Sequence, residues 1–148
     1  MADATIQTTK APWHLWVVGV VSLLWNSIGV MDFVMTETKN KTYMTSFTPA
    51  QLDFYYSFPL WVVVAWGIAV CGGALGSLLL LLRKNLAVHL FLLSLVGIVL
   101  TDVRNFAQPK GMEIMGGAKA LAFCSIILVI GVLLLVYARS MSKRGVLR

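Results

Sequence analysis

The sequence predicts an all-α membrane protein, an antiparallel bundle of four transmembrane helices with a short interfacial helix in its first outer loop. Of its 148 residues, 59% are hydrophobic and only 12% are charged, whereas soluble domains carry about 25% charged residues. Four apolar runs approach or exceed the roughly 20 residues that a helix needs to cross a bilayer. We expect one integral membrane domain over residues 1–148, with spans at residues 13–35, 60–82, 86–104 and 118–138.

The first span is expected to remain as a membrane anchor and not to be cleaved as a signal peptide. It is longer than the apolar core of a signal peptide. Only Lys10 precedes it as a basic residue, and no small-residue cleavage motif follows it.

The two cysteines are predicted to act as small apolar residues. Cys71 and Cys124 lie inside the second and fourth spans, without CxxC or His/Cys ligand spacing. We therefore expect neither a disulfide nor a structural zinc site.

The basic residues predict the orientation of the bundle. Four spans place both termini on one side of the membrane, and the basic residues of that side are Lys10, Arg83, Lys84, Arg139, Lys143, Arg144 and Arg148. The positive-inside rule then places both termini in the cytoplasm of a bacterial inner membrane. We expect this face to attract anionic lipid headgroups. No nucleic-acid partner is expected, because aromatic residues do not alternate with the basic ones.

The first outer loop contains a helix signal over residues 49–57. Thr48 is suited to the N-cap, Pro49 to the first helical position and Gln51 to a capping box. The aromatic residues that follow favour a helix lying flat at the outer interface. This helix is either part of an aromatic belt or a lid over the outer end of the bundle.

Small residues recur at helical spacing, which favours close helix packing in lipid. Gly72 and Gly76 form a GxxxG pair in the second span. The full set expected at helix contacts is Ser22, Gly29, Gly72, Gly73, Gly76, Ser77 and Gly97. Such contacts form within one bundle or between protomers, and the pattern alone does not imply a dimer.

An aspartate in the first span is the first candidate functional residue. Asp32 lies toward the outer end of that span, where a carboxylate costs less than at the bilayer centre. We predict an ion pair between Asp32 and Arg104, at the outer end of the third span. Lys119 and Lys39 are alternative cations, and Asp102 competes for them.

Asn26 lies six residues before Asp32 on the same face of the first span. Its amide needs a hydrogen-bond partner on another helix. The candidate partners are the hydroxyls of Ser22, Ser94 and Ser125. Two interpretations remain open: a polar clamp between helices, or a small outward-opening pocket lined by Asn26, Asp32 and Arg104.

Two weaker ligand sets are present, and we predict no metal and no cofactor from either. His14 and His89 both lie near cytoplasmic ends of spans, where a pair of facing histidines could hold a b-type haem. Interfacial imidazoles are the alternative. Methionine thioethers suit Cu(I), although methionine more often serves as adaptable packing. The outer methionines concerned are Met31, Met35, Met112 and Met115.

Four stretches carry a family resemblance. They are "WN..G..D" at 25–32, "FTPAQLDFYYSFPLW" at 47–61, "VCGGALGSLLLLLRK" at 70–84 and "HLFLLSLVGIV" at 89–99. This pattern resembles the DoxX-like group of small four-helix bacterial inner-membrane proteins, some of which are named sugar transporters. Members with the DoxX name include a small subunit associated with quinone-linked sulfur oxidation, but no reactive cysteine or cofactor motif in this chain lines up with that chemistry.

The sequence as a whole predicts a protein without enzymatic activity of its own. We expect a structural or accessory subunit that self-associates or docks onto a larger membrane complex. The alternative is an oligomeric transporter or channel for a small solute, because four helices are too few to build two alternating-access repeats in one chain. A third possibility is a redox-associated subunit that holds haem or quinone.

Overall fold

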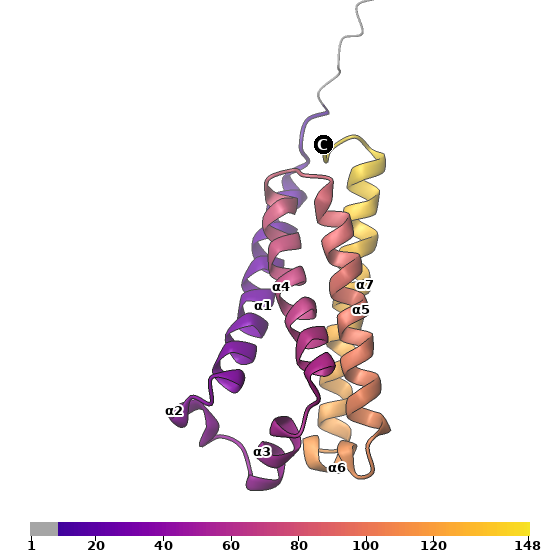
Figure 1. Cartoon of the computed structure of the whole chain (residues 1–148). Helices are drawn as coiled ribbons and strands as arrows, with labels where there is room; N and C mark the ends of the chain where they lie inside the picture. Colours follow the sequence, from indigo (N-terminus) through magenta and orange to yellow (C-terminus); the bar gives the residue numbers. More distant parts are fainter. Residues whose placement is uncertain (1–8) are drawn as a thin grey trace, which may run out of the picture.

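Four long helices form the molecule, as the fold prediction requires. The computed structural model describes residues 9–148. The long helices are α1 (Trp13–Glu37), α4 (Leu60–Leu81), α5 (Leu86–Ala107) and α7 (Ala118–Lys143), and each is long and apolar enough to cross a membrane. They run antiparallel, so that both ends of the described chain and the α4–α5 turn lie at one end of the bundle (Figure 1). We call this the terminal end and the opposite one the loop end.

Three short helices, α2 (Lys41–Met44), α3 (Pro49–Tyr56) and α6 (Gly111–Met115), cover the loop end. The predicted capping box starts α3: Thr48 Oγ1 accepts a hydrogen bond from the Gln51 N–H, and Gln51 Oε1 accepts one from the Thr48 N–H. The helices α2 and α6 were not predicted. Each has five or fewer residues, too few to show a helical hydrophobic period.

Three of the long helices extend beyond the predicted spans, whereas α4 ends one residue before the predicted position 82. The largest difference is in α7, which continues five residues past position 138 to Lys143. One side of this extension is polar, and the other side carries Met141, which is buried in the core. Apolar run length therefore underestimates a helix whose last turns leave the lipid but still pack against protein.

Glycines bring α4 and α5 into direct backbone contact. A Cβ atom on Gly97 would lie 2.5 Å from the carbonyl oxygen of Ala65 and 2.9 Å from the amide nitrogen of Ala69. On α4, Gly72 faces the Leu90 carbonyl and Gly76 faces the ring of Phe91. The predicted small-residue motif therefore packs this helix pair within one chain.

The helices α1 and α7 flank this central pair, with α1 packed on α4 and α7 packed on α5. At the terminal end all four meet in a dense core, which includes Leu15, Leu80, Phe91, Leu134, Ala138 and Met141. Toward the loop end α1 leans away from α4, and α2 and α3 lie across the gap (Figure 1). The bundle is therefore closed at one end and splayed at the other.

Side-chain size along α1 explains the splay. Near the terminal end, Gly19 lies so close to Leu81 of α4 that a Cβ atom would overlap that side chain. Near the loop end, the Phe33 ring is inserted against Trp66 with ring centroids 5.0 Å apart. A ring between two helices holds their axes farther apart than a glycine does, so the interhelical gap widens toward the loop end.

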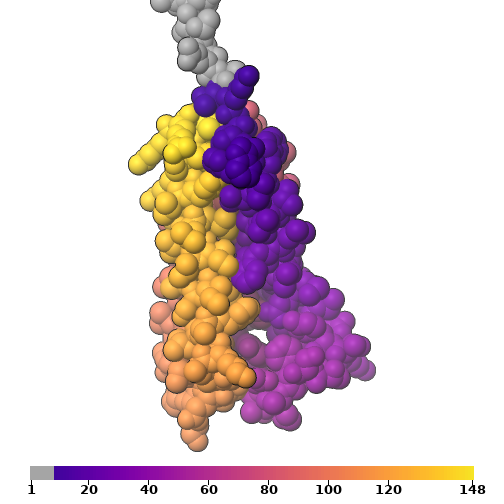
Figure 2. Space-filling view, turned by 180° about the vertical axis from the view of Figure 1, so that it is seen from behind, coloured from indigo at the N-terminus to yellow at the C-terminus, as the bar shows by residue number. Residues whose placement is uncertain are grey.

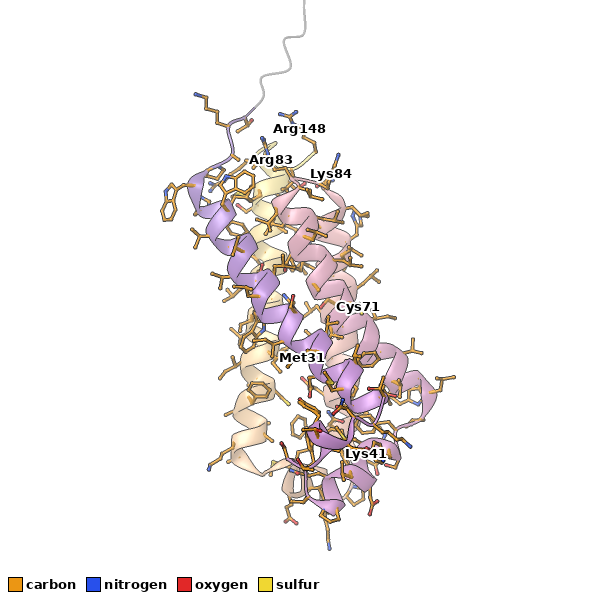
Figure 3. The ribbon with its side chains drawn as sticks, turned by 90° about the vertical axis from the view of Figure 1, so that its left-hand side faces the viewer. Met31, Lys41, Cys71, Arg83, Lys84 and Arg148 are labelled. Atoms are coloured by element: carbon orange, nitrogen blue, oxygen red, sulfur yellow. The ribbon has the colours of Figure 1, made fainter. Side chains whose placement is uncertain are left out.

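The last residues of the chain fasten the terminal end. The Arg148 N–H donates to the Arg83 carbonyl at 2.7 Å, and the Asn85 N–H donates to the Arg148 carbonyl at 2.7 Å. The Arg83 side chain also donates to the backbone carbonyls of Val146 and Thr9. Side chains of Arg83, Lys84 and Arg148 gather at this end (Figure 3).

Substituting Gly97 with alanine tests the central helix contact. We expect Gly97→Ala to lower the free energy of unfolding by about 1–3 kcal/mol, the usual cost of overpacking, because its Cβ atom would meet rigid backbone. Thermal melting in detergent measures the effect. Gly131→Ala is the control, since its Cβ atom would meet only the tips of Ile98 and Leu95 at 3.2–3.4 Å. Equal melting of the two variants would contradict the prediction.

Candidate functional site

A cavity of about 550 Å³ fills the splayed half of the bundle. Its walls come from all four long helices and from the short helices of the loop end. The polar lining includes Asn26, Asp32, Tyr43, Thr101, Asp102 and Asn105. The aromatic lining comprises Trp25, Phe47, Tyr55, Phe58, Trp66 and Phe123. The volume lies within the range of small-molecule sites, and few polar groups in an apolar wall are typical of such sites.

The cavity ends about halfway along the bundle. Beyond it lies a pocket of about 20 Å³ beside Gly73 and Phe91, which is of the order of one water molecule. The core cluster then fills the terminal end around Leu15 and Leu80, both fully buried. Within residues 9–148, this packed core separates the cavity from the terminal end.

The cavity opens sideways. The space-filling view shows a hole between the loop-end half of α7 and the segment that joins α1 to α3 (Figure 2). Near the middle of the bundle the two flanking helices meet through Trp25 and Phe123, whose ring centroids are 6.5 Å apart. Nearer the terminal end the His14 ring is hydrogen-bonded to the Tyr137 hydroxyl. The opening therefore lies where these contacts between α1 and α7 stop.

Asn26 forms the inner end of the cavity and also joins α1 to α4. Its Nδ2 donates to the Ser22 carbonyl at 2.8 Å and to the Ser77 hydroxyl at 3.3 Å. A Cβ atom on Gly73 would overlap Asn26 Oδ1, so glycine is needed to seat this amide. The partner hydroxyl is thus on Ser77. The predicted Ser94 instead donates to the Ala69 carbonyl.

The other predicted packing and partner residues on this side lie as follows. Ser22 is buried and donates to the Gly19 carbonyl. Ser125 is exposed and donates to Leu121 in its own helix. Gly29 lines the cavity, and its Cβ position is 3.3 Å from Val70 of α4. Asn26 is therefore both the helix clamp and part of a pocket wall, which the sequence presented as alternatives.

Asp32 faces the cavity two helical turns farther toward the loop end. Its Oδ1 accepts a hydrogen bond from the Tyr43 hydroxyl, which ties α2 to α1. Burial, together with this hydrogen bond and the charge of Asp32, raises the pKa of Tyr43 to about 12. Burial, with a smaller contribution from the same charge, also raises the pKa of Tyr55. Tyr43 therefore stays protonated and remains a hydrogen-bond donor well above neutral pH.

The predicted ion pair between Asp32 and Arg104 is wrong in this structure. The Arg104 guanidinium lies over the Phe58 ring, 5.7 Å from its centroid, and its buried Nη1 has no hydrogen-bond partner. Arg104 is also not part of the cavity wall. Of the alternative cations, Lys39 lies over the Tyr56 ring and Lys119 is exposed. A tyrosine hydroxyl takes the place that a cation was expected to fill.

The α5 wall of the cavity was not recognised from the sequence. Thr101 and Asn105 are buried there, one helical turn apart, with Asp102 beside them. Cys124 of α7 also lines the cavity, and its thiol lies beside the Asp102 carboxylate. Polar residues recur at helical spacing within this apolar span, and this pattern could have indicated a polar wall. From the sequence, Asp102 was considered only as a competitor for cations.

The weaker ligand sets are not brought together. His14 is engaged by Tyr137, whereas His89 is exposed, and no contact between the two rings occurs among residues 9–148. Met31 and Met112 are exposed, and Met35 is half-buried. Only Met115 of the outer methionines reaches the cavity wall. Within the same residues, no group of three or more His, Cys, Asp or Glu side chains is placed to hold a metal ion.

Comparison with known proteins finds no matching family model, curated protein or solved structure.

Removing the Asn26 amide should weaken the contact between α1 and α4. We expect Asn26→Ala to lower the free energy of unfolding by about 1 kcal/mol, as interhelical hydrogen bonds in membranes typically contribute. Unfolding in mixed micelles measures the change. Ser27→Ala is the control, because that exposed hydroxyl donates only to Leu23 of its own helix. A drop of the same size in both variants would argue against an interhelical clamp.

The Tyr43 phenol should titrate near pH 12 and not near pH 10. Because its folded pKa is raised, its contribution to stability is complete below pH 10 and is lost as the pH rises toward 12. Ultraviolet difference titration against Tyr43→Phe isolates this phenol. In Asp32→Asn its pKa should fall but stay above 10, since burial is the larger cause. Asp53→Asn, an exposed change in α3, should leave it unaltered; an unaltered pKa in Asp32→Asn would contradict the assignment.

Proposed function

We propose that this small four-span membrane protein binds a small solute in the loop-end cavity, as a carrier or as the binding component of a transport system. The observation that supports this most directly is the cavity itself, about 550 Å³ in volume, with polar groups from α1, α2 and α5 converging on an otherwise apolar space. Helices that needed only to pack could fill this volume with side chains. Empty volume in a bundle lowers stability, so its presence is better accounted for by a ligand.

We infer that the cavity faces the outside of a bacterial inner membrane. The seven basic residues counted on the side of the termini all belong to the terminal end, and both termini would then be cytoplasmic. The lateral opening between α1 and α7 would lie in the outer half of the membrane. A solute would reach it from the lipid or from the outer surface.

The closed terminal end argues for binding or carrying over open conduction. A channel needs a continuous path, and the core around Leu15 and Leu80 interrupts it. Transport would require that this core open in a second conformation, or that protomers assemble so that two bundles share one path. Self-association is therefore part of the transport version of this proposal.

An accessory role is the second candidate function. In its most apolar window α1 is only 11% buried, compared with 39% for α4, so its outer face is open to lipid or to a partner helix. A partner placed between α1 and α7 would close the lateral opening. The resemblance to DoxX-like proteins fits either candidate and remains a proposal, and nothing in the site favours haem or quinone binding.

Filling the cavity tests the first candidate against the second. Ile127 of α7 lines the cavity, whereas Ile126 beside it is 51% exposed on the outer surface. Native mass spectrometry of protein extracted gently from host membranes should show a bound small molecule. We expect Ile127→Trp to lose this adduct and Ile126→Trp to keep it, with neither variant melting below the unmodified protein.

Two results of this experiment would contradict solute binding. If the protein carries only stoichiometric foreign subunits, and the Ile127→Trp change makes no difference to what is bound, the solute-binding proposal fails. The accessory role then becomes the better account. An adduct with the mass of a phospholipid in both variants would likewise count against a specific solute site.

A further inference from the structure

The charge of the cavity wall is entirely negative. Asp32 on α1 and Asp102 on α5 belong to the lining, and no Lys, Arg or His does. Arg104, which was predicted to pair with Asp32, instead lies over the Phe58 ring. Among residues 9–148, the Asp32 side chain is hydrogen-bonded only to the neutral Tyr43 hydroxyl. A cavity with these walls favours a cationic occupant, since apolar surroundings strengthen an unscreened charge interaction.

A buried hydrogen-bond acceptor without a partner is a second, independent indication that the cavity holds a ligand. Asn105 lines the cavity and is only 5% exposed, and its Oδ1 accepts no hydrogen bond. A buried acceptor left unsatisfied costs free energy, and lipid offers no donor to replace water. A ligand that carries a donor group would satisfy this acceptor, whereas the unpartnered Nη1 of the preceding residue, Arg104, is not hydrogen-bonded to it. Asn105 and Asp102 are close in sequence on α5, so one donor-rich group could reach both.

The aromatic part of the cavity wall is suited to a ligand that combines a hydrocarbon group with a positive charge. The rings of Tyr55 and Trp66 lie stacked with centroids 6.4 Å apart, and Phe58 packs beside Tyr55 at 5.6 Å. Aromatic faces attract cations and also bury hydrocarbon. An anionic ligand would meet repulsion from both carboxylates and from the ring faces.

We propose that the cavity selects an organic cation, a protonated amine with an apolar body, whose ammonium group lies between Asp32 and Asp102 and donates to Asn105. This inference rests on the proposed solute-binding function and adds the chemical class of the ligand. The apolar body lies against the aromatic walls. The lateral opening admits such amphiphilic molecules directly from the membrane.

Three probes of one shape and different charge test the inference. They are 4-phenylbutylamine, 4-phenylbutanol and 4-phenylbutanoate, titrated onto the full chain in nanodiscs of zwitterionic lipid. Binding is followed by tryptophan fluorescence, since Trp25 and Trp66 line the cavity. We expect the amine to bind about tenfold or more tightly than the alcohol, as loss of a charged hydrogen-bond partner costs about 1.5 kcal/mol or more. The carboxylate should bind most weakly.

Matched variants locate the effect. Asp32→Asn and Asp102→Asn should each weaken amine binding about tenfold and leave alcohol binding unchanged. Asp53→Asn, on exposed α3 and outside the cavity wall, should change neither. Asp32 also accepts a hydrogen bond from Tyr43, so Asp32→Asn could alter the structure as well as the charge. Asp102→Asn removes a cavity charge and leaves the Tyr43 hydrogen bond intact. Melting temperatures confirm that each variant is folded.

Two outcomes would overturn the inference, and they differ from failure of the proposed function. Equal affinity for all three probes would show that the cavity selects only apolar bodies; solute binding would stand and cation selection would fall. Preference for the carboxylate would show that the field of Arg104 dominates the site. The proposed function itself is decided separately, by the adduct of the unmodified protein and its loss in Ile127→Trp.

Discussion

The backbone contact between α4 and α5 is the constraint on which the rest of the structure depends. Gly97 accepts the Ala65 and Ala69 backbone at a distance that excludes any side chain, and Gly72 and Gly76 extend the contact along α4. With these two helices pressed together, α1 packs mainly on α4 and α7 mainly on α5. Nothing then obliges α1 and α7 to meet along their whole length.

The cavity follows from that arrangement. At the terminal end the core and the residues around Arg83 and Arg148 hold all four helices together. Toward the loop end the ring of Phe33 keeps α1 away from α4, and α7 follows α5 away from α1. The space between them is closed from below by α2, α3 and α6, and it opens laterally (Figure 2). The first loop thus forms part of the cavity wall.

Several polar residues within the four long helices face the cavity. Asn26 clamps α1 to α4 at its inner end, and Asp32 holds α2 in place through Tyr43. Intramembrane carboxylates are expensive unless they face a cavity or a partner, and Asp32 and Asp102 both face the cavity. Within residues 9–148 the cavity lining contains no Lys, Arg or His, and the proposed selection of a cation rests on this.

The sequence by itself determined the four spans, the capping box at Thr48 and the small-residue helix contacts, because apolar run length, capping and glycine spacing are local signals. It also identified Asn26 and Asp32 as polar residues within a span that need partners. It could not assign their partners: Arg104 was the nearest cation by depth, yet the partner of Asp32 is Tyr43. Only the tertiary structure decided this, together with the existence of the cavity and the position of Asp102 in its wall. The directions of side chains around different helices, and the angle at which those helices diverge, arise from packing between segments far apart in the chain.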